Sequence, residues 1–237
     1  MMVGKGIEDI DISMPKDAYD IGKHTPTLSA YLTIIVRDSK GRVVNIHRQR
    51  SHSPTANFIG LLLPISYFAN TNSSYTITNT GGTTYSYTVG CTSSSITNCS
   101  GMGYPNSSKN YPSYLVMIQV GSGQQSNPYN AHSLASPIAN GSGAGQLVYG
   151  TVTTPSGFMA SGNSVYFYVS QAFNNQSGGT VNITEVGIII QFQLTCCCCG
   201  GSTNYGQLLV WYDVLSSPIS VPNGGSVTIY YTFTVNP

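Results

Sequence analysis

The feature that most constrains the fold is a strict alternation of apolar and polar side chains between Ser226 and Val235. Val, Ile, Tyr or Phe stands at every odd position from 227 to 235, and Thr or Tyr at every even position between them. A period of two is typical of a β-strand with one buried face. Further β-rich segments, separated by Gly, Asn and Pro turns, are found at 75–78, 83–89, 114–120, 147–153, 165–169, 181–192 and 207–214. The sequence therefore predicts an all-β protein, an antiparallel β-sandwich or jelly-roll.

The N-terminal part of the chain divides into an arm and the start of the β-sandwich. Residues 1–25 show neither a helical nor a strand period over a useful length, and we expect an extended N-terminal assembly arm there. The β-sandwich domain is expected over 26–237. It begins with a hairpin, because the β-rich segments 28–36 and 43–47 flank the turn-forming residues 38–41.

One short helix is predicted after the hairpin. Ser53 can cap it, Pro54 suits its first helical position, and Pro64 is expected to end it after an apolar run. The region at about 70–112 is poor in large aliphatic residues and rich in Ser, Thr, Asn and Tyr, so we interpret it as an insertion. Residues 121–146 form a long loop stretch, and loops of this length usually carry contacts or function.

The chain is unusually poor in charge. Asp, Glu, Lys and Arg make up 7% of its residues, against roughly 25% in an ordinary soluble domain. After residue 50 only Lys109, Glu185 and Asp213 carry a formal charge. Ser, Thr, Asn, Gln, Gly and 17 tyrosines must supply the surface instead, and such groups suit contact with other protein surfaces. A weakly charged monomer would lack the repulsion that keeps proteins apart, so we expect self-assembly; a neutral extracellular domain is the alternative.

Five blocks of the chain, in this order, resemble a loose family of virion structural and appendage proteins, fibre or coat, from tailed phages and thermophilic (archaeal) viruses. They are Tyr31 to Arg50 with Asn57-Phe58; Val120 to Gly123 followed by Pro128-Tyr129-Asn130, Leu134 and Pro137-Ile138; Gly143 to Leu147; Thr184 to Gly187 followed by Leu208-Leu209-Val210, Asp213-Val214-Leu215 and Pro218-Ile219; and Gly225 to Thr232. The resemblance spans about 28–237, without the 70–112 region and the cysteine run. It implies a β-sandwich that polymerises or decorates a particle and carries no catalytic set.

Six cysteines raise the question of disulfides. Cys91 and Cys99 enclose a short polar loop, so we expect a bridge between them, with two free thiols as the alternative. Four more cysteines are adjacent in the chain, at Cys196, Cys197, Cys198 and Cys199. Neighbouring residues of an extended segment point to opposite faces, which argues against one tetrahedral metal site. Intersubunit or local disulfides and a packed thiol ladder both stay open.

Candidate catalytic residues are few. Beyond residue 50 the chain offers only Glu185 and Asp213 as carboxylates, with His52 and His132 as bases. We interpret Glu185 as an internal hydrogen-bond acceptor on a strand and expect neither an enzyme nor a cofactor. The phosphate-binding, dinucleotide-binding and zinc-protease motifs are absent from the sequence.

A small basic cluster lies near the hairpin, at Arg42, His47, Arg48, Arg50 and His52. Nucleic-acid contact is one use of such a cluster, but acidic residues lie upstream, so a subunit contact or a solvated hairpin edge is preferred. Possible glycosylation sites of the Asn-x-Ser/Thr type are found at Asn72, Asn98, Asn106, Asn140, Asn175 and Asn182.

No secretory signal is visible at the start of the sequence, and the most apolar stretch, 58–68, is far shorter than the ~20 residues that a transmembrane helix needs. The expected protein is a subunit that binds itself, forming a virion component or an extracellular filament. A fibre, filament or appendage is preferred over a coat. A secreted pilin or adhesin, or a carbohydrate-binding module that meets a host receptor or glycan, is the alternative.

Overall fold

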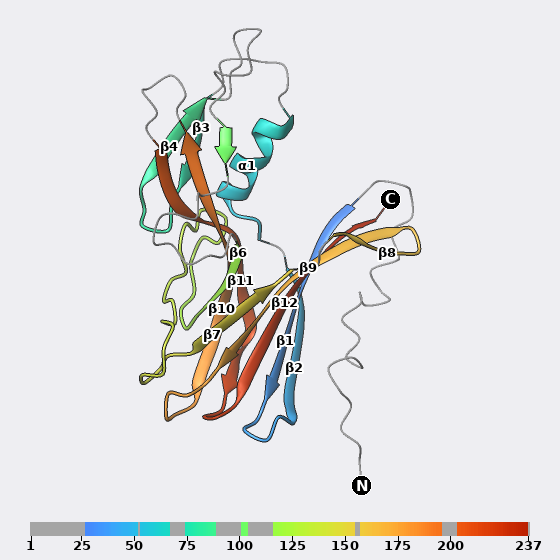
Figure 1. The fold of residues 1–237 in the computed structure, drawn as a ribbon, viewed down its shortest axis with the longest axis vertical. Helices are drawn as coiled ribbons and strands as arrows, with labels where there is room; N and C mark the ends of the chain where they lie inside the picture. The colour runs from blue at the N-terminus through green and yellow to red at the C-terminus, as the bar shows by residue number, and fades with distance from the viewer. Residues whose placement is uncertain are drawn as a thin grey trace. The chain divides into compact units, whose positions relative to one another are not determined.

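The computed structural model describes residues 27–51, 53–66, 74–88, 101–103, 116–154, 157–195 and 203–236. The described chain is all-β with antiparallel sheets and a single helix, as the sequence predicts (Figure 1). It folds as two compact units between which the chain alternates. The described residues of unit 1 fall within 1–52, 138–183 and 215–237, and those of unit 2 within 53–137 and 184–214. The predicted arm, residues 1–25, lies outside the described residues.

Unit 1 is built on one large antiparallel sheet with the strand order β2-β1-β12-β9-β7, in which β8 also pairs with β9. Figure 1 shows β12 side by side with β1 and β9. The strands are β1 (Thr27–Arg37), β2 (Val43–Ser51), β7 (Val148–Thr153), β8 (Met159–Ser161), β9 (Ser164–Asn174) and β12 (Ser226–Asn236). β12 therefore lies in the middle of the sheet and β2 at one edge.

The predicted first hairpin is present in unit 1. β1 and β2 pair antiparallel, with Ile35 opposite Ile46 and Leu32 opposite Gln49. The turn closes where the Asp38 amide donates to the Arg42 carbonyl at 2.9 Å. Gly41 takes a φ of +76° there, a conformation that glycine adopts without steric cost.

The alternation in β12 places its odd residues on a buried face, as predicted. Val227, Ile229 and Tyr231 are fully buried, and they pair in register with buried residues of β1. The other face is less open than the alternation suggests, because Thr232 is also buried. Thr232 lies in register between two longer side chains, Tyr31 of β1 and Tyr168 of β9, which explains how a small polar residue loses its exposure in a central strand.

Unit 2 contains the helix and two smaller sheets. Its elements are α1 (Ala56–Ser66), β3 (Ser74–Thr78), β4 (Thr84–Thr88), β5 (Gly101–Gly103) and β6 (Val116–Gly121). β10 (Val181–Thr195) and β11 (Thr203–Val221) run through both units. One sheet has the order β11-β10-β5, with β6 also paired to β10, and β3 pairs with β4 in the other. The described parts of the expected insertion, 74–88 and 101–103, belong to this unit.

The helix is present, but both of its predicted ends were wrong. Ser53 does not cap it; the Ser53 carbonyl accepts from the Tyr212 amide at 3.0 Å, and Pro54 bridges to Trp211 of β11. The first helical hydrogen bond runs from Ile59 to the Thr55 carbonyl, 3.3 Å away. Pro64 does not end the helix either, because it lies in the last turn, where the missing N–H removes a single hydrogen bond.

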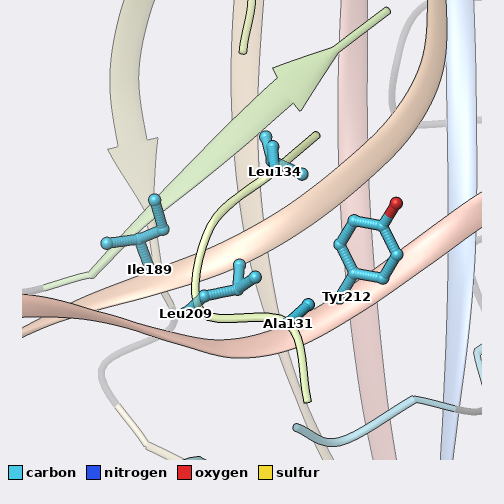
Figure 2. Packing of buried hydrophobic residues seen from close by; sticks show 5 residues of the cluster. All are labelled: Ala131, Leu134, Ile189, Leu209 and Tyr212. Carbon is cyan, nitrogen blue, oxygen red and sulfur yellow. The ribbon is translucent and has the colours of Figure 1, made fainter. Parts of the chain in front are cut away.

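A compact apolar cluster fills the core of unit 2 (Figure 2). Its buried members come from three elements that are distant in sequence: the loop after β6, β10 and β11. They are Ala131, Leu134, Ile189, Leu209 and Tyr212. Gly187 allows this close approach, because a Cβ at that position would stand 2.5 Å from the Leu209 side chain.

Candidate functional site

Several of the predicted site residues lie outside the described part of the chain. This is the case for all six cysteines, so neither the expected Cys91–Cys99 bridge nor the Cys196–Cys199 run is placed. The sequons at Asn72, Asn98 and Asn106 and the base His52 also lie there.

The clearest candidate site among the described residues is the side chain of Glu185, on β10 in unit 2. Its carboxylate is fully buried and accepts four hydrogen bonds. One oxygen, Oε1, accepts from the backbone amides of Gly123 and Ser136 at 3.2 and 2.8 Å. The other, Oε2, accepts from the Ala135 amide at 3.0 Å and from the Tyr212 hydroxyl at 2.7 Å. Glu185 is thus an internal acceptor, and this prediction is confirmed.

The Tyr212 hydroxyl connects this carboxylate to the loop after β6. Its oxygen accepts from the Gln125 amide at 2.7 Å while its proton is donated to Glu185. Burial, and then the neighbouring Glu185 carboxylate, raise the pKa of Tyr212 well above its ordinary value, although the Gln125 amide opposes the shift. A phenol with this pKa stays protonated at neutral pH and serves as a donor. These hydrogen bonds fix the 121–137 loop to the sheet, and both oxygens of the Glu185 carboxylate act as acceptors in them.

Two other polar candidates, Asp213 and His132, belong to the same unit. Asp213 follows Tyr212 on β11 and is also buried. His132 lies in the loop after β6 and is partly buried. Among the described residues no group of three or more His, Cys, Asp or Glu side chains could hold a metal ion.

The three described sequons differ in what their side chains do. Asn175 is fully buried, and its Nδ2 donates to the carbonyls of Gly179 and Val221 at 2.8 Å each. A glycan would replace one of the two hydrogens of this nitrogen and so remove one of these bonds, and the buried side chain of folded unit 1 leaves no access for its attachment. Asn140 and Asn182 are exposed, and each uses its Oδ1 as the acceptor in its hydrogen bond.

The residues of the predicted basic cluster do not all lie on the same face of β2. Arg42 forms an ion pair with Asp38 at 2.6 Å, and this arginine lowers the pKa of the Asp38 carboxyl below its ordinary value. Arg48 and Arg50 lie on one face of β2, which they share with Val44 and Ile46, whereas His47 lies on the other face, in contact with Gln49 at 2.9 Å. The predicted cluster is therefore a strand face with two arginines.

That face of β2 is also apolar. Val44 is 55% exposed and Ile46 is 48% exposed, and these two neighbouring aliphatic side chains form an apolar patch on this face. β2 is the edge strand of its sheet and pairs with β1 on one side. An edge strand with uncovered aliphatic side chains is a ready surface for the addition of another strand.

A second uncovered apolar group lies at the far end of the same sheet. Leu28, Val235 and Val165 stand in register across β1, β12 and β9, and all three are exposed. Phe158 is 76% exposed and packs edge-to-face on Phe167 at 5.8 Å. The sequence did not reveal this group, because Val235 continues the buried alternation of its strand and the period alone does not show where burial ends.

No protein-family model matches this chain, and no match to it was found among curated proteins or solved structures. Among the described residues no helix is both long and apolar enough to cross a membrane.

Proposed function

We propose that this chain is a structural subunit that assembles with copies of itself, as a virus-encoded fibre, filament or appendage in preference to a coat. The observation that supports this most is the edge strand β2, on which Val44 and Ile46 stand exposed and to whose outer side no described strand is paired. Proteins that stay monomeric usually protect such an edge with short strands, prolines or charges, whereas β2 has nine residues, no proline, and its arginines only in its second half.

Two further features support the proposal. The apolar row of Leu28, Val235 and Val165 gives the same sheet a second surface that association would cover. The body of the chain carries few charges, since after residue 50 there are only three. Contacts that are individually weak become durable when they repeat along a lattice, so modest surfaces of this kind suffice for a fibre.

Two features oppose a catalytic role. The buried Glu185 carboxylate is engaged by four donors, and Tyr212 beside it is held in its protonated form. A general base needs a free lone pair near substrate, and this centre is occupied by its own loop. We therefore assign Glu185 to the integrity of unit 2.

The test is negative-stain electron microscopy of the purified full chain over a range of protein concentrations, with and without reductant. Regular filaments, rings or shells are expected, together with a concentration-dependent mass in light scattering. A monomer that stays monodisperse at the highest concentration would overturn the proposal and favour a carbohydrate-binding module, which glycan arrays would then test. Virion genes beside the coding sequence are expected; secretion genes there would favour a pilin.

A further inference from the structure

The outer face of β2 carries an ordered pattern along the strand. From its start to its end, Val44 and Ile46 come first and Arg48 and Arg50 follow. All four side chains are exposed. A strand that added to this edge would meet two aliphatic side chains and then two positive charges, so it would need apolar residues and acidic residues at alternate positions.

A segment of the same sequence has this pattern in reverse. In Glu8-Asp9-Ile10-Asp11-Ile12 the residues of one parity are Glu8, Ile10 and Ile12, and Asp9 and Asp11 fall between them. The alternation is short, which is why the 1–25 arm as a whole shows no period. On the side that carries Glu8, Ile10 and Ile12, the acidic residue precedes the two apolar residues. In β2 the two apolar residues precede the basic ones.

We propose that residues 8–12 of a second copy of this chain add to β2 as an antiparallel strand. In the register that we infer, Ile12 lies opposite Val44, Ile10 opposite Ile46, and Glu8 opposite Arg48. The proposal rests on the self-assembly proposed above and names the surface and the segment that carry it. Added strands of this kind gain backbone hydrogen bonds, while the alternate side chains fix the register.

The other face of the added strand is also compatible with this register. Asp9 would lie opposite His47, which is only partly buried on the other face of β2. Asp11 would lie opposite Asn45, a polar side chain that is exposed. Opposite charges and polar pairs at directly facing positions stabilise a sheet, so neither face of the added strand meets an unfavourable neighbour.

A parallel strand would fit less well. Placing Ile10 and Ile12 opposite Val44 and Ile46 in the parallel direction would bring Lys16 opposite Arg50, and like charges at facing positions destabilise a sheet. It would also bring Pro15 into the strand, where a proline removes a backbone donor. The antiparallel register leaves both residues beyond the paired segment.

The direction of the added strand favours a second copy over the chain's own arm. Thr27, where β1 begins, lies near the Ser51 end of β2, because Ala30 pairs with Ser51. An arm that passed directly from Thr27 around to the outer edge of β2 would run parallel to it. To lie antiparallel, it would first have to return along about 34 Å of strand, the length of ten residues. A neighbouring copy meets no such requirement.

The experiment measures assembly of charge-reversed variants of the full chain. Glu8→Lys and Arg48→Glu are each expected to raise the critical concentration, measured by sedimentation, about fivefold, because each places like charges at facing positions. The double variant restores an opposite pair and is expected to return the critical concentration to within about twofold of the unmodified chain. Circular dichroism checks that the Arg48→Glu variant is folded.

Two controls come from the same chain. Asp20→Lys makes the same charge change in the arm outside residues 8–12, and it is expected to leave assembly unchanged. Arg50→Glu tests the register: rescue of Glu8→Lys by Arg50→Glu in place of Arg48→Glu would overturn the inferred register. Assembly that is unaffected by both single reversals would overturn the proposed strand addition while the self-assembly proposal stands.

A photo-reactive amino acid at position 46 identifies the occupant directly. In a mixture of isotopically heavy and light chains, cross-links to residues 8–12 that join a heavy chain to a light one are expected. Cross-links confined to single chains would show that the arm covers its own strand and would overturn the second-copy assignment. Failure of the unmodified chain to assemble would instead refute the proposed function itself.

Discussion

Replacing Glu185 with Gln tests whether its carboxylate holds unit 2 together. The Gln side chain has one acceptor oxygen, so whichever way its amide is oriented, the NH₂ group faces two donors. In one orientation these are the Gly123 and Ser136 amides, and in the other the Ala135 amide and the Tyr212 hydroxyl. Each charge-assisted bond contributes about 1.5–3 kcal/mol. The two lost bonds, offset by the relief of a buried charge, give an expected destabilisation of about 3 kcal/mol.

The chain contains a natural reporter for this change. Trp211 is its only tryptophan, is buried in unit 2, and packs edge-to-face on Phe58 at 5.3 Å. Guanidinium unfolding followed by Trp211 fluorescence therefore reports on the unit that contains Glu185. Asp38→Asn, the same chemical change in an exposed turn of unit 1, is the control and is expected to leave the tryptophan transition in place. A destabilisation below about 0.5 kcal/mol for Glu185→Gln would refute the structural role of the carboxylate.

Three further predictions concern single sites. Asn175→Asp is expected to destabilise unit 1 by about 3 kcal/mol in thermal unfolding followed by circular dichroism, because a carboxylate would face the Gly179 and Val221 carbonyls that Asn175 now donates to; no change would contradict the assigned bonds. Gly121→Ala is expected to lower the Trp211 unfolding midpoint strongly, since the added Cβ would collide with the Glu185 carboxylate; a midpoint equal to that of the unmodified chain would refute this contact. The raised pKa of Tyr212 stabilises the folded state fully below pH 10, the ordinary phenol value, and this contribution is lost as the pH rises above it. In alkaline solution the free energy of unfolding is therefore expected to fall less steeply for Tyr212→Phe than for the unmodified chain, and parallel pH profiles would contradict the assignment.

The sequence predicted the elements whose signal is local. The period of two placed Val227, Ile229 and Tyr231 on a buried strand face, and a turn-forming cluster located the β1–β2 hairpin. Both follow from neighbouring residues that share one backbone geometry. The role of Glu185 as an acceptor was also predictable, because an acidic residue inside an apolar strand must be paired to be buried.

The donors to Glu185 could not be predicted. Three of the four lie in a loop 49 to 62 residues away in the chain, and the fourth, the Tyr212 hydroxyl, is 27 residues away on β11. Neither periodicity nor composition indicates which loop closes over which strand. The start of the helix was mistaken for a related reason. Ser53 and Pro54 have the local character of a helix start, but contacts with β11 hold them outside it. Long-range contacts override local preference at both places.

The central place of β12 has a consequence for synthesis on the ribosome. In chain order β12 follows every other strand of its sheet, yet it lies between β1 and β9 and pairs with both. A nascent chain that lacks residues 226–236 can form the β1–β2 and β7–β9 pairs, but it cannot join them into one sheet. The edge strand β2, to which we propose that a second copy adds, is therefore part of a finished sheet only after β12 has left the exit tunnel. This order would delay polymerisation until translation has passed the strand that completes the subunit.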